Sequence, residues 1–241
     1  MTERVTSRRR GSYGIDAPYG PALIAAMALL YLVMAITSGR WRMLVPATLM
    51  LLLLGYYLHG TLRAKFVVWA GLLDQLHLRG DERILDLGCG RGAVLLMAAQ
   101  HLTTGRAVGV DLWRSFDQSG NSLETTRRNA IAEGVADRVE LHTANMTALP
   151  FADSSFDVVV SSLAIHNISR RADREKAIEE AVRVLHPGGR LMIADIRATR
   201  QYREHLARCE MNDVSRRGLA WGPWHLVTAT KPEPSRAGTP P

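Results

Sequence analysis

The chain has 241 residues, two cysteines and a formal net charge of +7, because 30 lysines and arginines outnumber 23 aspartates and glutamates. This length accommodates one α/β domain of about 150 residues and a further segment. Cys89 and Cys209 form neither a metal-binding spacing nor a disulfide framework, which argues against a disulfide-stapled secreted domain and favours a reducing compartment. The basic balance suits nucleic acid, an anionic membrane surface, or a surface with no specific partner.

Two uncharged apolar runs follow a polar, basic N-terminal tail of residues 1–20. The runs cover residues 21–37 and 43–58, and as helices they would measure roughly 26 Å and 24 Å. A bilayer core is about 27–30 Å thick, and neither run has the polar stripe of a soluble core helix. The pattern therefore predicts a transmembrane helical hairpin over residues 21–58.

The ends of the two runs agree with this interpretation. Trp41, Tyr56 and Tyr57 lie where amphipathic rings favour the membrane interface, and Pro46 falls in the first turn of the second run. Helices that lie on the membrane surface or associate with each other remain an alternative. A cleaved secretory signal fits poorly, because no A-x-A site follows and a second apolar run comes at once.

The distribution of positive charge predicts the orientation of the hairpin. The connector between the runs has two arginines, whereas the N-terminal tail has four, at Arg4, Arg8, Arg9 and Arg10. Positive residues favour the cytoplasmic side, and two crossings return the chain to that side, in agreement with Arg63 and Lys65. We expect a two-pass cytoplasmic membrane protein with both its N-terminus and its larger domain in the cytoplasm. Ala22, Ala25, Ala26 and Gly55 would also permit helix pairing in a homo-oligomer.

A linking helix is predicted over residues 59–79. Its apolar residues recur at helical spacing, at Leu62, Phe66, Trp69, Leu72, Leu73 and Leu76. The pattern is typical of a helix that packs on a sheet, and the same helix could form one wall of an active site.

A glycine-rich turn follows at residues 86–92, with the sequence DLGCGRG. It comes after the short apolar run 83–85 and before the helical pattern of residues 93–102. A strand, a glycine turn and a helix N-terminus form a cradle for a nucleotide cofactor. A dinucleotide site favours G-x-G-x-x-G, whereas the spacing D-x-G-x-G-x-G places a carboxylate to meet a cation.

Strand and helix patterns then alternate along the chain. Further strands are predicted at 107–111, 139–143, 156–161, 190–195 and 224–230, and helices at 123–133, 174–185 and 200–211. Such alternation implies a parallel sheet covered by helices on both faces, here over residues 80–231. The Pro-rich residues 232–241 are predicted to be a disordered tail.

The glycine turn resembles the first motif of class I S-adenosylmethionine-dependent methyltransferases, whose cofactor carries an ammonium group and a sulfonium. Residues 149–159, 184–191 and 224–231 resemble later segments of the same family, in the family's order. The resemblance covers residues 80–231 and is of the type found in ubiquinone and menaquinone biosynthesis and its small-molecule relatives. It implies a methyltransferase with a Rossmann-like, seven-stranded, mostly parallel sheet whose last strand is antiparallel.

The same resemblance implies a cofactor site, and the spacing of the cysteines predicts no metal site. Asp86 and the backbone of Gly88, Cys89, Gly90 and Gly92 would hold the methionine part of S-adenosylmethionine.

The adenosine part would lie along the ends of the later strands. Asp111 ends the second strand, where a carboxylate can accept both ribose hydroxyls, although it could also be a surface acid. The resemblance implies that Leu112 packs on the adenine and that the Ser161 backbone faces the reacting end. Asn145, followed by Met146, replaces the usual acid near the adenine amine; an amide oxygen can accept that bond, or Asn145 is an ordinary turn residue.

A polar insertion at residues 117–121 has two interpretations. Its residues are typical of helix capping and a solvated loop. Alternatively, Trp113, Asp117 and Gln118 fold over the cofactor.

The sequence says less about the methyl acceptor than about the cofactor. The motif of Asn or Asp, two prolines and Tyr is absent at the end of the fourth strand, which argues against methylation of DNA base amines or glutamine. Residues 161–167 (SSLAIHN) stand there instead, so His166 is the candidate catalytic base, or else it orients the following loop. A basic run could meet anionic lipid headgroups or be solvated: Arg197, Arg200, Arg203, Arg208, Arg216 and Arg217. No aromatic residues interleave with it, so we expect no nucleic-acid partner.

These features favour a membrane-anchored methyltransferase that acts on a small amphiphilic acceptor, such as a lipid, a quinone precursor or an isoprenoid. A second hypothesis is the same chemistry on a soluble molecule or a protein side chain, with the hairpin as an anchor or an oligomerisation device. A third is a non-catalytic scaffold that binds S-adenosylmethionine.

Overall fold

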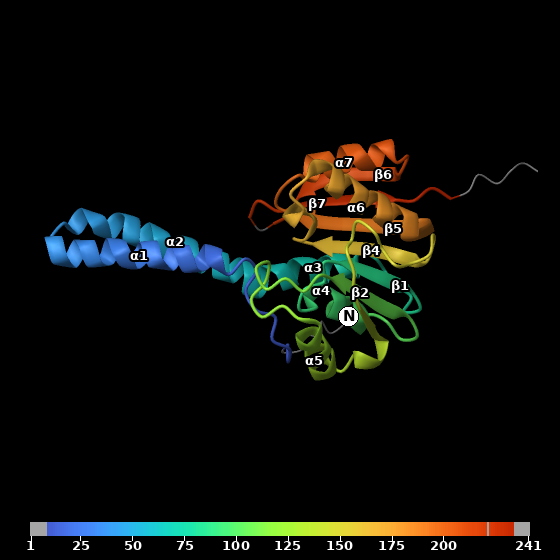
Figure 1. Cartoon of the computed structure of the whole chain (residues 1–241), viewed down its shortest axis with the longest axis horizontal. Helices are drawn as coiled ribbons and strands as arrows, with labels where there is room; N and C mark the ends of the chain where they lie inside the picture. Colours follow the sequence, from blue (N-terminus) through green and yellow to red (C-terminus); the bar gives the residue numbers. More distant parts are fainter. Residues whose placement is uncertain (1–8, 221, 234–241) are drawn as a thin grey trace, which may run out of the picture.

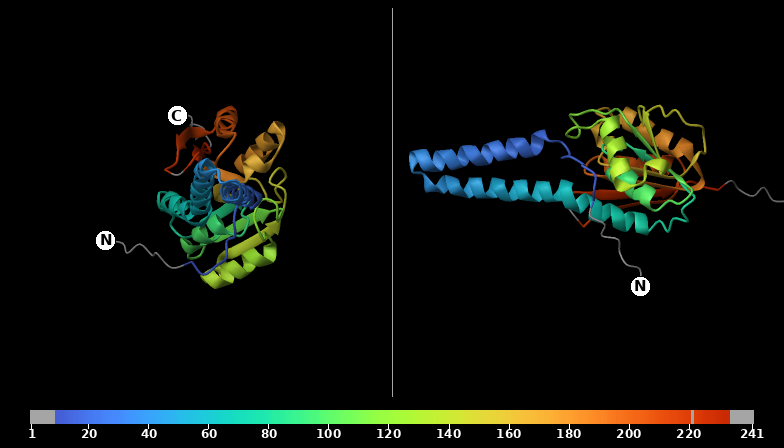
Figure 2. Two further views of the ribbon diagram at one scale, coloured as in Figure 1. Left: turned by 90° about the vertical axis from the view of Figure 1, so that its left-hand side faces the viewer. Right: turned by 90° about the horizontal axis from the view of Figure 1, so that it is seen from below.

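A long helical hairpin projects from one end of a sheet domain (Figure 1). The computed structural model describes residues 9–220 and 222–233 of the chain. The rest of the predicted disordered tail, residues 234–241, lies outside the described residues, as do residues 1–8. The views in Figure 2 show that the two helices of the hairpin run side by side for their whole length.

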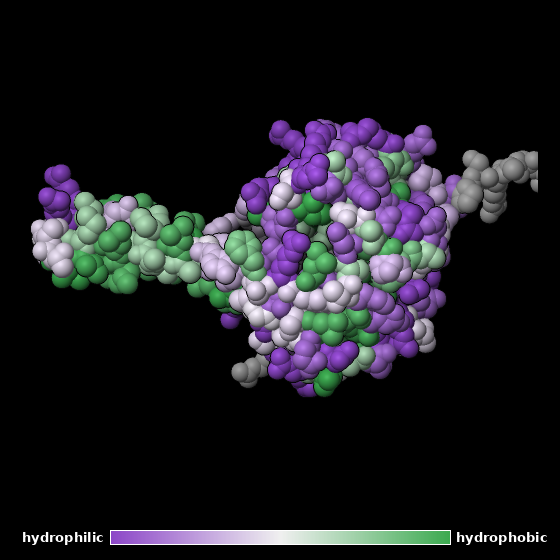
Figure 3. Space-filling model, viewed as in Figure 1, coloured by the Kyte–Doolittle hydropathy of each residue, from purple (hydrophilic) through white to green (hydrophobic). Residues whose placement is uncertain are grey.

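The hairpin consists of α1 (Tyr19–Ser38) and α2 (Leu44–His59), joined by the turn η1 (Trp41–Met43). Small buried residues form the contact between the helices, at Ala28 and Ala35 of α1 and Ala47 of α2. Large apolar side chains point outward, and the rod is hydrophobic on its surface where the sheet domain is mostly hydrophilic (Figure 3). By length and composition, α1 and the helical stretch Trp41–Asp74 could each cross a membrane. Both apolar runs are therefore helical, as expected.

The second helix continues into the domain. A π-helical turn, η2 (Gly60–Ala64), joins α2 to α3 (Lys65–Asp74). The helix predicted to reach residue 79 ends at Asp74, and a loop leads to the first strand. The large apolar side chains differ in exposure on the two sides of η2. Those of α2 are mostly exposed, whereas Trp69, Leu72 and Leu73 of α3 are buried in the core.

Seven strands form one sheet in the order β3-β2-β1-β4-β5-β7-β6. Their bounds are β1 Arg83–Leu87, β2 Arg106–Asp111, β3 Val139–Thr143, β4 Phe156–Ser162, β5 Leu185–Asp195, β6 Asn212–Gly218 and β7 His225–Thr230. The first five strands pair in parallel, and β7 pairs antiparallel with both β5 and β6. The central strands are apolar on both faces because helices cover both. The predicted seven-stranded fold is confirmed.

The helices divide between the two faces of the sheet. On one face α3, α4 (Ala93–Gln100) and α5 (Leu123–Glu133) pack around a core that includes Trp69 and Leu95. On the other, α6 (Arg171–Val184) and α7 (Thr199–Arg208) pack around Phe156, Ile178 and Tyr202.

Two strands differ from the sequence predictions. β6 was not predicted, because residues 212–218 are polar and mostly exposed, as suits a sheet edge. β5 begins at Leu185 and includes the residues of 186–189 that were predicted to be a turn. An irregular register between Phe156 and Val158 of the partner strand accommodates the extra length.

The N-terminal segment is attached to the domain, although it was predicted to be a tail. The Tyr13 hydroxyl donates to Glu133 Oε1 of α5 at 2.8 Å, and Asn129 of the same helix bonds the backbone of Ser12. Ala17 N then donates to Asp117 O at 2.9 Å, immediately before α1. Residues 9–18 therefore connect the base of the hairpin to α5 and to the loop after β2.

Candidate active site

The turn between β1 and α4 requires glycine at several positions. Gly88, Gly90 and Gly92 have φ angles of +73°, +52° and +86°, which residues with a side chain rarely adopt. A Cβ on Gly88 would overlap Ala164, and one on Gly90 would lie 2.5 Å from Gln118 Oε1. The glycines thus let the backbone approach other groups at the carboxyl edge of the sheet.

Asp86 lies at the end of β1 with only 1 % of its surface exposed. Its Oδ1 atom has no hydrogen-bond partner within the part of the chain that the structure describes. The pKa of this carboxyl is raised to about 7, chiefly by burial and also by the charge of Asp111, whereas the backbone N–H of Leu95 and the charge of Lys65 oppose the shift. A buried carboxylate oxygen without a hydrogen-bond partner is costly unless a ligand supplies a donor, so Asp86 fits a cationic group.

Asp111 joins the loops around the cavity. Its Oδ2 accepts a hydrogen bond from Gly90 N at 2.8 Å, and its Oδ1 accepts from Trp113 N at 2.6 Å. The Asn121 amide also donates to Oδ1, at 3.3 Å. The carboxylate predicted to meet the ribose is therefore fixed at the end of β2.

A cavity of about 540 Å³ lies at this edge, a size suited to a small-molecule cofactor. Most of the predicted cofactor residues line it, namely Asp86, Gly88, Cys89, Gly90, Asp111, Leu112, Asn145 and Met146. Gly92 lies outside the lining and precedes α4 as its N-cap.

Ser161 is also not part of the lining, because it is fully buried and its hydroxyl donates to Leu87 O at 2.9 Å. The next residue, Ser162, lines the cavity instead, and its hydroxyl accepts from Trp69 Nε1 at 2.8 Å.

The polar insertion closes part of the cavity. Asp117, Gln118 and Asn121 line it, and Gln118 Oε1 accepts from Arg91 N of the glycine turn at 2.8 Å. Trp113 does not line it, since its ring nitrogen donates to Thr143 Oγ1. Asp117 and Gln118 are therefore placed at the cavity predicted to hold the cofactor, whereas Trp113 is not.

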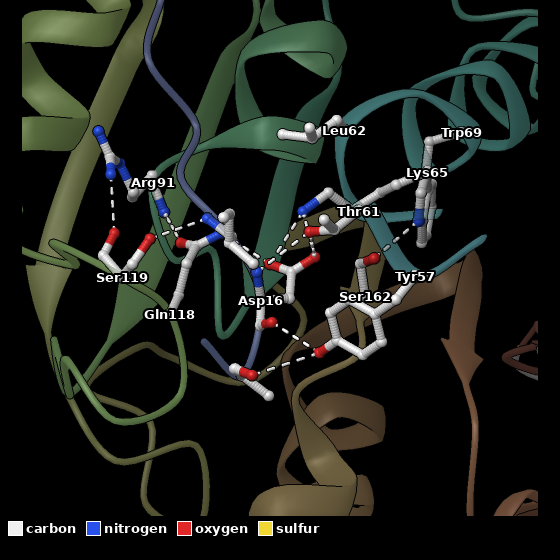
Figure 4. A network of polar contacts seen from close by, with 12 residues as sticks. Asp16, Tyr57, Thr61, Leu62, Lys65, Trp69, Arg91, Gln118, Ser119 and Ser162 are labelled. Carbon is white, nitrogen blue, oxygen red and sulfur yellow. Dashed lines mark hydrogen bonds and ion pairs between the residues drawn. The ribbon is translucent and has the colours of Figure 1, made fainter. Parts of the chain in front are cut away.

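Residues at the base of the hairpin also line the cavity; the sequence analysis allowed the linking helix as one wall of an active site but did not single out Lys65 or Asp16. Lys65, at the start of α3, lies 3.0 Å and 2.7 Å from the two carboxylate oxygens of Asp16 (Figure 4). The Thr61 hydroxyl and the Gln118 amide each donate to Asp16 at 2.8 Å. A lysine on the apolar face of the linking helix was the available signal.

His166 lies on the turn η4 (Ile165–Asn167) after β4, beside the fully buried Asp195 at the end of β5. Its Nδ1 lies 2.5 Å from Asp195 Oδ1, although not at a hydrogen-bonding angle, and its backbone N donates to Oδ2 at 3.1 Å. The Tyr202 hydroxyl also donates to Oδ2, and burial raises the pKa of Tyr202, so the hydroxyl keeps its proton. The sequence analysis did not identify Asp195 or Tyr202.

His166 lines a second cavity, of about 690 Å³, rather than the first. The two cavities share lining residues, namely Arg114, Asp117, Asn167 and Ser169. His166 therefore lies in a cavity that adjoins the cofactor cavity.

The predicted basic run is not one surface. Arg197 lines the second cavity, whereas Arg208 pairs with Glu175 at 3.0 Å on α6. Arg216 lies on β6, where its Nε donates to Thr199 Oγ1.

Both cysteines are free thiols, and burial raises the pKa of Cys89 well above its usual range. Within the described residues, no group of three or more His, Cys, Asp or Glu side chains could hold a metal ion.

The family described as a methyltransferase domain matches residues 85–193. Methyltransferase GfsG of Streptomyces halstedii is 38% identical over 125 residues, which cover 52% of this chain and 41% of the relative. The ubiquinone/menaquinone biosynthesis C-methyltransferase UbiE of Roseobacter denitrificans is 36% identical over 124 residues, covering 52% and 46%. The chain thus spans less than half the length of either relative.

A solved structure shares the fold. The S-adenosylmethionine-dependent methyltransferase from Aquifex aeolicus is similar with a TM-score of 0.55 at 18% identity, over 67% of this chain and 88% of that one.

The sheet domain has the fold of a solved S-adenosylmethionine-dependent methyltransferase, and its residues 85–193 match the methyltransferase-domain family. Its cofactor is S-adenosylmethionine. The residues present fit that molecule, because the unpartnered Asp86 oxygen suits its ammonium group and the glycine turn gives the close approach it needs.

Proposed function

We propose that this protein is a membrane-anchored methyltransferase that methylates a small amphiphilic acceptor, such as a lipid, a quinone precursor or an isoprenoid. The observation that carries the proposal is that residues from the base of the apolar hairpin, Asp16 and Lys65, line the cofactor cavity. A hairpin in the bilayer would hold the site at the membrane surface, where an amphiphilic acceptor is concentrated. The relative named for quinone biosynthesis supports an acceptor of this kind.

The cytoplasmic side is part of the proposal. Residues 9–18 contact α5 and the loop after β2, so the two ends of the hairpin lie on the same side of any membrane that it crosses. The arginines of the N-terminal segment support the cytoplasm as that side.

When bound, the cofactor would supply a methyl group on a positively charged sulfur. The acceptor atom would bond to the methyl carbon, and the sulfur would leave in line with that attack. The protein's part is alignment, which can contribute effective molarities of about 10⁵–10⁸ M. The glycine turn, Asp86 and Asp111 would orient the donor, and the insertion at 117–121 would keep water from the cavity.

His166 would take the proton from the acceptor. Asp195 faces Nδ1 of the ring, which leaves Nε2 as the basic nitrogen, and Tyr202 holds Asp195 in place.

Labelled S-adenosylmethionine tests the proposal. The full-length protein in vesicles is incubated separately with total membrane lipids, a soluble cell extract and a membrane-protein fraction. Label in an extractable lipid is expected, and an Asp111→Ala variant should lose it. Label only in a polar metabolite or a protein would refute the amphiphilic acceptor, and cofactor binding without any transfer would favour the scaffold hypothesis.

A further inference from the structure

Lys65 carries a positive charge at a position where only 4 % of its surface is exposed. Burying an ammonium group is costly unless it is paired, and Asp16 pairs with it. The pair lies at the base of the hairpin, outside the segment 85–193 that matches the methyltransferase family. Both residues nevertheless line the cofactor cavity.

Lys65 and Asp16 differ in how many of their hydrogen-bonding groups already have a partner. Asp16 accepts from Lys65 at both oxygens, and from Thr61 and Gln118 as well (Figure 4). A lysine ammonium has three N–H groups, and the hydrogen bonds found for Lys65 among the described residues go only to the two oxygens of Asp16. Lys65 therefore retains a donor for a ligand in the cavity, whereas Asp16 is fully occupied.

A complementary group lines the same cavity. Asp86 has an oxygen without a partner, and Lys65 is near enough for its charge to affect the Asp86 carboxyl. An acceptor at Asp86 and a donor at Lys65 match a ligand end that carries both an ammonium and a carboxylate group. The methionine part of S-adenosylmethionine is such an end.

We propose that Lys65 binds the carboxylate of the cofactor's methionine part, and that Asp16 and Gln118 position it for this. The inference rests on the cofactor site of the proposed function. Gln118 bonds Asp16 with its amide nitrogen and Arg91 N with its amide oxygen, so it connects the base of the hairpin to the glycine turn. The membrane anchor is in this way a component of the cofactor site.

The test compares two ligands by calorimetry on the full-length protein in detergent. One is S-adenosylhomocysteine, and the other is its decarboxylated analogue, which has hydrogen in place of the carboxylate. The wild type should bind the analogue about 10- to 100-fold more weakly, as expected for a charge-assisted hydrogen bond. Lys65→Met should weaken binding of S-adenosylhomocysteine by a similar factor and leave the affinity for the analogue unchanged.

Lys176→Met, an equal loss of charge at an exposed position on α6, is the matched control and should behave as the wild type. If Lys65→Met is unstable because Asp16 is left unpaired, the double variant Asp16→Asn/Lys65→Met removes both charges and should show the same loss of discrimination. Equal weakening of both ligands in both variants would overturn the proposal, since Lys65 would then serve only the fold. A wild type that binds both ligands equally would overturn it too. A wild type that binds neither would instead refute the cofactor site itself.

Discussion

The carboxyl edge of the sheet has two halves that are built in different ways. At the ends of β1 and β2, the cofactor half is formed mainly by backbone: three glycines with positive φ, and a carboxylate, Asp111, that accepts backbone N–H groups. At the ends of β4 and β5, the acceptor half is formed by side chains, with His166 beside Asp195. The first half depends on local conformation and the second on tertiary packing.

This difference separates two kinds of specificity. A backbone cradle recognises what all cofactor molecules of one kind share, and its shape follows from a short sequence. The proposed base, a histidine beside a buried carboxylate, would determine which acceptor proton can be removed, and it could change without any change in the cradle. The two halves should therefore respond separately to substitution, in turnover and in cofactor affinity.

The largest expected effect is in the acceptor half. His166→Ala removes the proposed base and should lower turnover by about 10²–10⁴-fold for an acceptor that must lose a proton. Cofactor affinity, measured by calorimetry, should stay within about twofold because His166 does not line that cavity. The control is His101→Ala, at the C-cap of α4. A parallel loss of cofactor affinity would mean that the halves are not separate, and undiminished turnover would remove the assignment of the base.

The second effect belongs to the cofactor half. Asp86→Asn removes the charge proposed to face the cofactor ammonium, and affinity for S-adenosylhomocysteine should fall by about 10²-fold, as for the loss of one partner of a buried charged pair. The cofactor-free variant should melt at a higher temperature than the wild type at pH 8, because it no longer buries an unpartnered charge. Asp137→Asn, at an exposed acid, should change neither quantity. Unchanged affinity would mean that Asp86 does not meet the cofactor.

The sequence predicted most of the sheet domain, because buried parallel strands and their helices have strong patterns. The apolar run Val158 to Val160 and the glycine turn were sufficient to place β4 and β1. The edge strand β6 escaped prediction because its polar residues face solvent and its pairing partner, β7, follows it in the chain. The N-terminal segment escaped for a similar reason, since its contacts with Glu133 and Asn129 join residues more than a hundred positions apart.

The residues of the candidate site also divide into those that the sequence could predict and those that it could not. Asp86 and Asp111 could be predicted because each ends a strand beside a recognisable turn. Asp195 could not, because only the pairing of β4 with β5 brings it to His166. Lys65 was interpreted as a charge that marks the cytoplasmic side, and its place in the cavity depends on how α3 packs on the sheet.

The proposed membrane anchor adds a further difference between the two halves. The acceptor half would take its substrate from the bilayer, and the cofactor half would take its ligand from water. Leu52 of α2 and Val67 of α3 are 65 % and 68 % exposed on successive parts of one helical stretch. An arginine at a membrane-spanning position costs about 2.5–3.5 kcal/mol, whereas one on a soluble surface costs little. Leu52→Arg should therefore reduce the fraction that resists alkaline extraction from membranes and lower turnover of a lipid acceptor, with cofactor affinity unchanged.

Val67→Arg is the matched control for that experiment and should behave as the wild type in extraction and turnover. Equal behaviour of the two variants would indicate that both positions face the same solvent. The hairpin would then be a surface or association element rather than a membrane span.

The smallest expected effect is a pH dependence confined to the cofactor half. Because burial raises the pKa of Asp86 to about 7, most molecules without cofactor hold it protonated at pH 6 and ionised at pH 8. Since the ionised form would meet the ammonium group, affinity for S-adenosylhomocysteine should rise about tenfold over that range, and Asp86→Asn should abolish the rise.

The stability of the cofactor-free protein should change in the opposite direction. In the unfolded chain Asp86 is already ionised above about pH 4, so between about pH 4 and pH 7 the folded state binds one proton more than the unfolded state. The contribution of this residue to the stability of the cofactor-free protein is therefore greatest at low pH and is lost as pH rises toward 7, while affinity changes in the opposite direction. A melting temperature and an affinity that rose together with pH, and did so equally in Asp86→Asn, would assign the titration to a different group.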